Sequence, residues 1–228
     1  MTLYDAIFER HSVRDYLEQP FPREIRYDLG EKADDISEEG DLNVQLVIGE
    51  KEAFSGINSY GRFHGAQNYF IMIGRKSPDL DMRIGYYGEK LVLFLQTLGL
   101  NSCWVGMTYK KVLAAYRLCD DEKIVCVIAF GYGKTSGVRH RIKTVSQVSN
   151  ASEKTPEWFL KGVEAALLAP TALNQQKFSF EYMGEGENGK GLVRAQRGFS
   201  IFGYTKIDLG IAMLHFELGA GKDNFEWV

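Results

Sequence analysis

The spacing of apolar residues along the 228-residue chain predicts six helices. In four segments an apolar residue recurs every three or four positions, as on the buried face of a helix: 3–9, 23–33, 109–116 and 158–168. Two further segments, 85–98 and 207–218, are apolar on nearly all sides. A helix with so little polar surface belongs in the interior of a domain.

Strands are predicted where apolar residues alternate with polar ones or form short runs. These segments are 42–48, 69–73, 124–130 and 178–182, with 102–105 as a short strand or turn. Turns are expected at the Gly/Ser/Asn-rich residues 55–62 and at 184–191. Gly99 and Gly219 each follow a Leu at the end of an apolar helix, where a C-terminal cap is common. We therefore expect strands and helices in one chain, with two of the helices buried.

The same pattern suggests two halves, 1–148 and 156–228, joined by a polar linker at 144–155. When Leu98-Gly99 is aligned with Leu218-Gly219, the two apolar helices superpose with an offset of 120 residues. An internal duplication explains this likeness. The alternative is that two buried helices resemble each other by chance.

Composition narrows the class of protein. Hydrophobic residues make up 45% of the chain, charged residues 25%, and the net charge is −3. This balance gives no electrostatic reason to expect a nucleic-acid or anionic-membrane partner, and no apolar run approaches the roughly 20 residues of a membrane span. Three cysteines without CxxC spacing read as reduced thiols. With no apolar leader at the N-terminus, we expect a cytoplasmic protein.

One motif imitates a phosphate-binding loop. Gly133-Lys134-Thr135 follows a buried strand, as in a P-loop, but a P-loop needs a glycine five positions before its Gly-Lys pair. That position is Ile128, inside the predicted strand. The sequence therefore argues against a nucleoside triphosphatase.

Three other segments could carry chemistry. Arg10-His-Ser-Val-Arg14 and Arg139-His-Arg141 offer guanidinium groups that suit a phosphate. The alternative for both is a solvated turn. The third segment, Ala169-Pro-Thr-Ala-Leu-Asn-Gln-Gln176, could bring amide groups close to a planar heterocycle, or it could be a connecting turn.

These segments resemble motifs of the nitroreductases, the FMN-dependent oxidoreductases with an NADH oxidase-like fold. Arg10-His-Ser-Val-Arg-Asp-Tyr16 is similar to their RRSxRxF signature, and residues 169–176 to their APSxxNxQPW motif, with Lys177 in place of Pro. Gly99-Leu-Asn-Ser-Cys-Trp-Val-Gly106 is similar to their LGxxSCWxG segment. Arg139-His-Arg141 after residues 127–131 is similar to their last strand and basic pair.

The resemblance implies how the first half would bind FMN. Arg10, Ser12, Arg139 and Arg141 would hold its phosphate. Arg14 would lie near the N1/O2 edge, where a cation stabilises the anionic reduced flavin.

The resemblance also implies a contribution from the remaining motifs. Pro170, Thr171 and Asn174 would pack against and hydrogen-bond the isoalloxazine and ribityl groups, and the Gly106 backbone would approach the N5 side. No general acid, nucleophile or metal ligand is required. The implied fold is α+β, with a mixed, mostly antiparallel sheet around buried central helices. The implied function is NAD(P)H-dependent reduction of a nitroaromatic, quinone or similar small acceptor in two hydride-transfer steps.

The chain departs from the family pattern in one respect. The first half carries Asp34–Gly40 where the family places its Pro-Ser-Asn loop, and the second half carries that loop without the Arg motif. This predicts one chain that imitates a dimer and acts as a monomer, although a homodimer through other surfaces stays compatible with it. The alternative function is a degenerate flavin-binding protein without significant turnover. The sequence decides neither between NADH and NADPH nor among acceptors.

Overall fold

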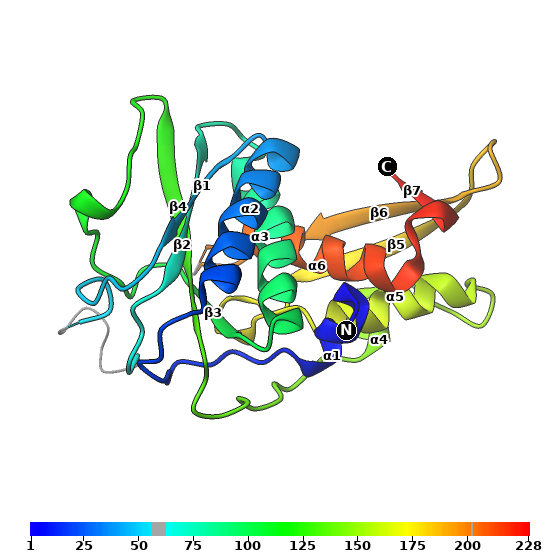
Figure 1. The fold of residues 1–228 in the computed structure, drawn as a ribbon. Helices are drawn as coiled ribbons and strands as arrows, with labels where there is room; N and C mark the ends of the chain where they lie inside the picture. The colour runs from blue at the N-terminus through cyan, green and yellow to red at the C-terminus, as the bar shows by residue number, and fades with distance from the viewer. Residues whose placement is uncertain (56–62, 202) are drawn as a thin grey trace. The chain divides into compact units, whose positions relative to one another are not determined.

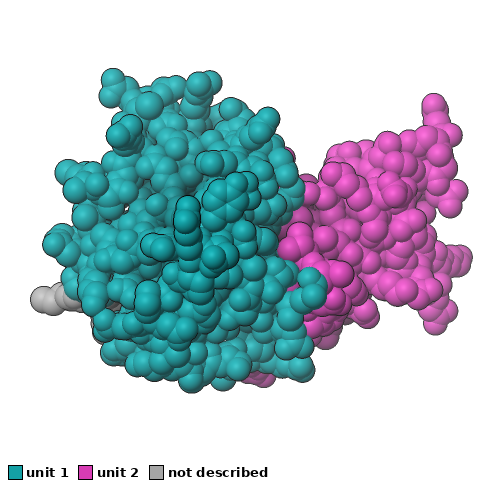
Figure 2. Space-filling model, in the orientation of Figure 1, with its two compact units in different colours: residues 1, 9–80, 90–139 teal, residues 2–8, 81–89, 140–228 magenta. Residues whose placement is uncertain are grey.

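The structure is a computed structural model that describes residues 1–55, 63–201 and 203–228 (Figure 1). The expected loop at 55–62 lies outside the described residues except for Ser55. The chain forms two compact units, coloured separately in Figure 2. The first contains residues 1, 9–80 and 90–139, and the second contains residues 2–8, 81–89 and 140–228.

The first unit is built on a four-stranded antiparallel sheet in the order β1-β2-β4-β3. Its strands are β1 (Asn43–Val47), β2 (Tyr69–Arg75), β3 (Asn101–Val105) and β4 (Glu122–Gly131). β2 and β4 lie in the centre and are almost wholly apolar, because both of their faces are covered. The strands agree with the predicted ranges to within two residues at each end.

Helix α2 (Arg23–Gly40) and the later turns of α3 (Leu80–Thr97) cover one face of this sheet (Figure 1). α2 is longer than predicted and includes the residues where the family places its Pro-Ser-Asn loop. Gly99 follows α3 with φ +73°, so its predicted role as a C-terminal cap is confirmed. The opposite face packs on a cluster that includes Phe54, Phe63 and Tyr69.

The second unit contains a separate three-stranded sheet in the order β5-β6-β7. β5 (Phe178–Glu185) and β6 (Gly191–Arg197) are antiparallel, and β7 (Phe225–Trp227) is parallel to β6. We predicted β5 but neither β6 nor β7. The helices of this unit are α1 (Leu3–Glu9), the residues of α3 from 81 to 89, α4 (Val145–Val148), α5 (Glu157–Leu167) and α6 (Thr205–Ala220).

α6 is the central helix of the second unit and packs against α5 and against the early turns of α3. Glycines allow both contacts. A Cβ on Gly210 would lie 2.0 Å from the Met82 carbonyl oxygen, and one on Gly219 would lie 2.5 Å from the Lys161 carbonyl oxygen. α6 continues to Ala220 and ends at Gly221, which has φ +78°. The expectation that Gly219 caps this helix was therefore wrong.

This difference bears on the proposed duplication. Gly99 ends a helix through its left-handed backbone, whereas Gly219 lies inside a helix and permits a close helix contact. The two Leu-Gly pairs thus have different roles, and the duplication stays a prediction. Residues 144–155, expected as a linker, contain α4, whose Val148 is fully buried.

The predicted helix at 109–116 was wrong. That segment is irregular apart from a 3₁₀ turn at Leu113–Ala115. Tyr109, Val112 and Tyr116 do pack on the first unit's apolar cluster, which explains their spacing. The backbone amides are bound elsewhere: Lys110 N donates to Ala53 O at 2.7 Å.

Candidate functional site

The segment that follows α1 crosses the end of the first unit's sheet in an extended conformation. Val13 N donates to Ser102 O at 3.0 Å, and Leu17 N donates to Tyr132 O at 2.8 Å. Between them the fully buried Tyr16 donates its hydroxyl to Val13 O at 2.5 Å. The segment is therefore fixed to β3 and to the end of β4.

This anchoring places three of the predicted residues around one buried thiol. Arg10 is buried, Ser12 is half-buried and Arg14 is exposed. Burial raises the pKa of Cys103, while the charges of Arg14 and Arg10 and a hydrogen bond with Ser12 act to lower it. The Cys103 thiol is therefore close enough to Arg10, Arg14 and Ser12 for each of them to affect its pKa.

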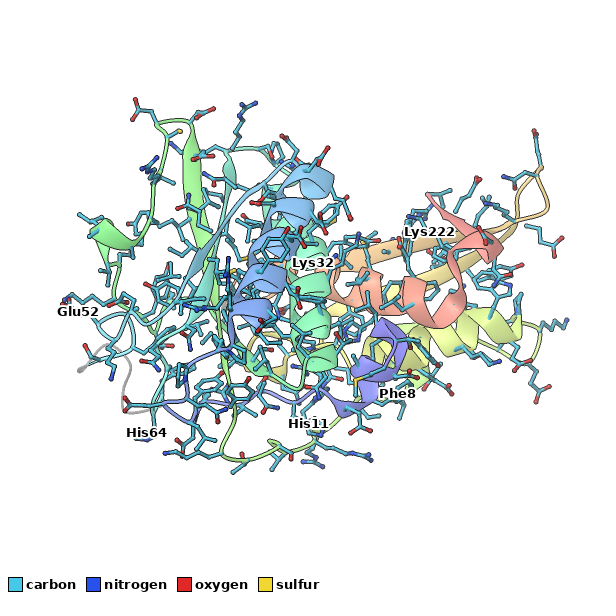
Figure 3. The ribbon with its side chains drawn as sticks, viewed as in Figure 1. Phe8, His11, Lys32, Glu52, His64 and Lys222 are labelled. Carbon is cyan, nitrogen blue, oxygen red and sulfur yellow. The ribbon has the colours of Figure 1, made fainter. Side chains whose placement is uncertain are left out.

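His11, labelled in Figure 3, lies on the same segment and is affected by the charge of Arg139. Burial lowers the pKa of His11, and the charges of Arg10 and Arg139 lower it further. A hydrogen bond at the Arg10 backbone and the charge of Glu9 oppose this shift. The first unit thus gathers guanidinium groups from two segments that are 129 positions apart in the sequence.

Gly137 permits this approach. Its φ is +78°, and a Cβ added there would lie 2.6 Å from His11 Cβ and 3.3 Å from Ser12 O. Any larger residue would push the segment after β4 away from the one after α1. The P-loop-like Lys134 has a structural role here, because its Nζ pairs with Asp15 Oδ1 at 2.8 Å.

The other predicted residues lie apart from this group along the chain. Gly106 directly follows β3 in the first unit and is half-buried. Arg141, Pro170, Thr171 and Asn174 belong to the second unit.

In the second unit, the loop between α5 and β5 has an unusual backbone. Leu173, Asn174 and Gln176 have φ values of +53°, +53° and +45°, in the left-handed region that side chains other than glycine rarely adopt. Such conformations persist only where the surroundings enforce them, and they concentrate at functional sites. These three residues belong to the loop at residues 170–176, which we call the 170s loop.

One carboxylate from α6 holds the first part of the 170s loop. Asp208 is 2% exposed. Its Oδ1 accepts from Ala172 N at 2.9 Å, and its Oδ2 accepts from Gln175 Nε2 at 2.7 Å. Burial raises the pKa of Asp208 to about 6, although both hydrogen bonds act to lower it.

Gln176 holds the second part of the loop. It is buried, and its Nε2 donates to Arg141 O and to Asn174 Oδ1, both at 2.9 Å. Its Oε1 accepts from Lys143 N at 2.9 Å. Asn174 Nδ2 also donates to Arg141 O, at 2.8 Å. These bonds join the Arg141 segment to the 170s loop.

The structure thus gathers the predicted residues into two sets. In the first unit the charges of Arg10 and Arg139 act on His11, and Arg10, Arg14 and Ser12 act on Cys103. In the second unit the Arg141 backbone, Thr171 and Asn174 are connected through Gln176.

Sequence reasoning missed the residues that support the 170s loop. Of these, Asp208 had a detectable signal, because it is the one acid in the apolar run Ile207–Leu214. Gln175 and Gln176 adjoin Asn174 in the motif but gave no sign of their partners. Among the described residues no group of three or more His, Cys, Asp or Glu could hold a metal ion. Each helix among the described residues is too short or too polar to span a membrane.

Comparison with known proteins places the chain in a family. A family model described as "Putative TM nitroreductase" matches residues 2–220. The crystal structure of a "putative nitroreductase" from Thermotoga maritima is 26% identical, with a TM-score of 0.62 over 98% of this chain and 85% of that one. No curated protein matches the chain.

Two other solved structures share the fold at lower identity. A nitroreductase family protein from Clostridium difficile 630 is 22% identical, with a TM-score of 0.51 over 68% of this chain and 100% of that one. A "putative nitroreductase in complex with FMN" from Desulfovibrio desulfuricans is 16% identical, with a TM-score of 0.53 over 68% of this chain and 99% of that one. The expected nitroreductase-type α+β fold is confirmed.

Proposed function

The chain belongs to the nitroreductase family, and on that premise we propose that it is an FMN-dependent oxidoreductase. It takes electrons from NAD(P)H and passes them to a small acceptor such as a nitroaromatic compound or a quinone. The observation that carries this proposal is that the charges of Arg10 and Arg139 act on His11, and those of Arg10 and Arg14 on Cys103, where Gly137 brings the two segments together. A phosphate dianion suits such a group, because guanidinium forms short, bidentate bonds to phosphate.

The residues present fit FMN on two further grounds. In the first unit, the Ser12 hydroxyl adds a neutral hydrogen-bonding group beside the cations. In the second unit, the buried Gln175 Oε1 has no hydrogen-bond partner within the described part of the chain. A ring N–H of an isoalloxazine is the kind of donor that would satisfy this acceptor.

We assign the following roles to the chain's own groups. Arg10, Ser12, Arg139 and Arg141 bind the phosphate, and Arg14 supplies positive charge at the N1/O2 edge. Bound FMN supplies the hydride chemistry itself, so the protein needs to bind, orient and tune it.

The 170s loop and the turn after β3 complete the assignment. Pro170 and Thr171 pack against the flavin, Asn174 hydrogen-bonds it, and the Gly106 backbone approaches the N5 side. The side-chain amide of Asn174 already bonds Arg141 O and Gln176. Asn174 Oδ1 keeps a second lone pair, which can accept a further hydrogen bond.

Exposed apolar side chains support an aromatic or quinone-like acceptor. Leu173, in the 170s loop, is 73% exposed. Phe199 and Ile201 are 82% and 80% exposed on the segment after β6. Gly198 N, just before it, donates to the carbonyl of Lys177, the residue that follows the loop, at 2.7 Å. Small-molecule sites are commonly lined by apolar and aromatic groups of this kind.

A titration with FMN and with riboflavin tests the proposal. FMN should bind much more tightly than riboflavin, since riboflavin lacks the phosphate, and it should saturate at one FMN per chain if one chain imitates a dimer. Equal affinity for the two flavins would contradict the phosphate assignment. Two flavins per chain, or flavin loss that follows dissociation of a homodimer on dilution, would contradict the pseudo-dimer.

Turnover is tested separately. Under anaerobic conditions NADH or NADPH should bleach the yellow complex, and a quinone or nitroaromatic acceptor should restore its colour. A yellow complex that neither nucleotide bleaches would instead identify a flavin-binding protein without turnover.

A further inference from the structure

Asp208 binds the 170s loop on both sides of its left-handed residues Leu173 and Asn174. Its two carboxylate oxygens accept hydrogen bonds from Ala172 N and from Gln175 Nε2, at 2.9 and 2.7 Å. Leu173 and Asn174, both left-handed, lie between these two donors in the sequence. The carboxylate therefore binds the backbone just before this left-handed pair and a side chain just after it. Left-handed conformations are unfavourable for side chains other than glycine.

The surroundings of Gln175 fix the direction of its amide. Its Nε2 faces two acceptors, Asp208 Oδ2 at 2.7 Å and Gly203 O at 3.2 Å. Reversing the amide would bring its oxygen against both of them. The site thus presents two donors, the Ala172 N–H and the Gln175 NH₂ group, and it needs two acceptor oxygens opposite them. A carboxylate offers two acceptors, whereas an asparagine amide offers one acceptor and one donor group.

Asp208 is also held firmly in place. It lies in the first turns of α6, two residues before Gly210, where the helix approaches the Met82 carbonyl most closely. Its side chain is almost fully buried. A buried carboxylate is unfavourable unless its hydrogen bonds compensate, and the bonds that each of its oxygens accepts come from the 170s loop.

We propose that Asp208 is a positioning residue of the flavin site, whose carboxylate holds the 170s loop in the left-handed conformation needed to contact the flavin. This inference rests on the proposed function. It assigns no chemical step to Asp208, which acts through the loop. Without the carboxylate, the loop relaxes toward ordinary backbone conformations, and both flavin affinity and flavin reduction potential change.

The test combines two substitutions. Asp208→Asn places an amide NH₂ against a donor and should weaken FMN binding by about tenfold, the equivalent of one hydrogen bond. Gln175→Glu alone brings two carboxylates together and should also weaken it. In the double variant the new amide at position 208 can donate to the new carboxylate at position 175 while its oxygen still accepts from Ala172 N. Binding should therefore be restored in part, because the carboxylate at position 175 still faces Gly203 O, to which the wild-type amide donates at 3.2 Å.

A matched control separates positioning from general stability. Glu89 is another buried carboxylate of the second unit, and its Oε1 lies 2.9 Å from His215 Nε2. Glu89→Gln should lower the unfolding temperature without changing the FMN dissociation constant or the midpoint potential of the bound flavin. Asp208→Ala removes the same two contacts from the helix side, without touching Gln175, and should also weaken FMN binding. It supplies the measurement if Asp208→Asn does not fold.

The readouts are FMN affinity by fluorescence titration, midpoint potential and unfolding temperature. Weaker binding with a shifted potential in Asp208→Asn, partly restored in the double variant, supports the inference. Unchanged affinity and potential would overturn it, and so would losses in Glu89→Gln as large as those in Asp208→Asn. If the wild-type protein binds no FMN, the proposed function fails and takes this inference with it. If the wild-type protein binds FMN and the variants bind it equally well, the inference alone fails.

Discussion

A substitution of Gly210 by alanine tests the packing of α6, the helix that carries Asp208. A Cβ at this position would lie 2.0 Å from the Met82 carbonyl oxygen and 2.7 Å from Tyr86 N. Both obstacles are backbone atoms, so no side-chain rotation relieves the clash. Gly85 faces the same crossing, and a Cβ there would lie 2.1 Å from Ile207 O. The two helices meet backbone to backbone at this point.

The expected effect follows from the displacement required. Ordinary contact begins at 3.4 Å, so the backbones must separate by about 1.4 Å at this point. Overpacking of this kind costs about 1–3 kcal/mol, or more where backbone must move. A gap of 0.5–1 Å already removes about a quarter to a half of the dispersion attraction between facing groups. Alanine's better helix propensity returns about 1 kcal/mol. Because backbone must move here, the cost lies at the upper end of that range, and we expect a net loss of about 2 kcal/mol, which lowers the unfolding temperature by about 4–8 °C.

Gly30→Ala is the matched control. Gly30 also lies inside a helix, α2, but nothing lies within 4 Å of the position that a Cβ would take. The same change there should raise the unfolding free energy by up to about 1 kcal/mol. Thermal unfolding followed by far-UV circular dichroism measures both variants. A Gly210→Ala variant as stable as wild type would refute the close helix crossing, whatever happens at Gly30.

Four further predictions concern the site. Arg10→Ala should weaken FMN binding by about 1.5–3 kcal/mol, the usual contribution of a charge-assisted hydrogen bond, and should leave riboflavin affinity unchanged; fluorescence titration with both flavins decides it. Gly137→Ala should weaken FMN binding in the same assay, because its Cβ would meet His11; affinity equal to wild type would contradict the close approach. The pKa of His11, held low by burial and by neighbouring arginines, should rise when FMN or inorganic phosphate binds, and a histidine NMR titration that shows no change would count against a phosphate there. The folded-state pKa of Asp208, about 6, lies above its ordinary value of 3.8, so the unfolding free energy should fall by about 3 kcal/mol as pH rises through that range. Urea unfolding of Asp208→Asn should lack that part of the fall, and parallel pH profiles would contradict it.

The sequence predicted those elements whose apolar periodicity and burial coincide. β4, at the centre of a sheet, is unbroken and apolar from Ile124 to Phe130, and α1 has the predicted bounds, Leu3–Glu9. β6 was missed because Arg194, Gln196 and Arg197 give it a weak alternation. The predicted helix at 109–116 shows the converse error, since helical spacing reported which side chains pack but not the backbone that carries them.

Glycines show a second limit of the sequence. Gly99, Gly137 and Gly219 look alike in a sequence, yet each has a different physical reason to be glycine. Gly99 needs a left-handed backbone, Gly219 needs the absence of a Cβ against the Lys161 carbonyl, and Gly137 needs both. Which reason applies depends on a neighbour that the local sequence does not name. For this reason the Leu-Gly likeness that suggested a duplication was a weak basis for equating the two helices.

The candidate site was predictable to the extent that its parts are short motifs. The Arg10 and Asn174 segments could be recognised, but the partners that hold them are distant in the sequence: Asp208 is 36 positions from Ala172 and Gln176 is 33 from Lys143. A loop with three left-handed residues would not keep that conformation without contacts to the rest of its unit, and so would not hold a ligand in a fixed position. Here it is bonded to a helix that is locked by backbone contacts at Gly210 and Gly219, so its unfavourable conformation rests on the most closely packed element of its unit. The strained backbone of the 170s loop is therefore held by Asp208 of α6. The close packing of α6 at Gly210 and Gly219, away from the candidate site, keeps that helix in place.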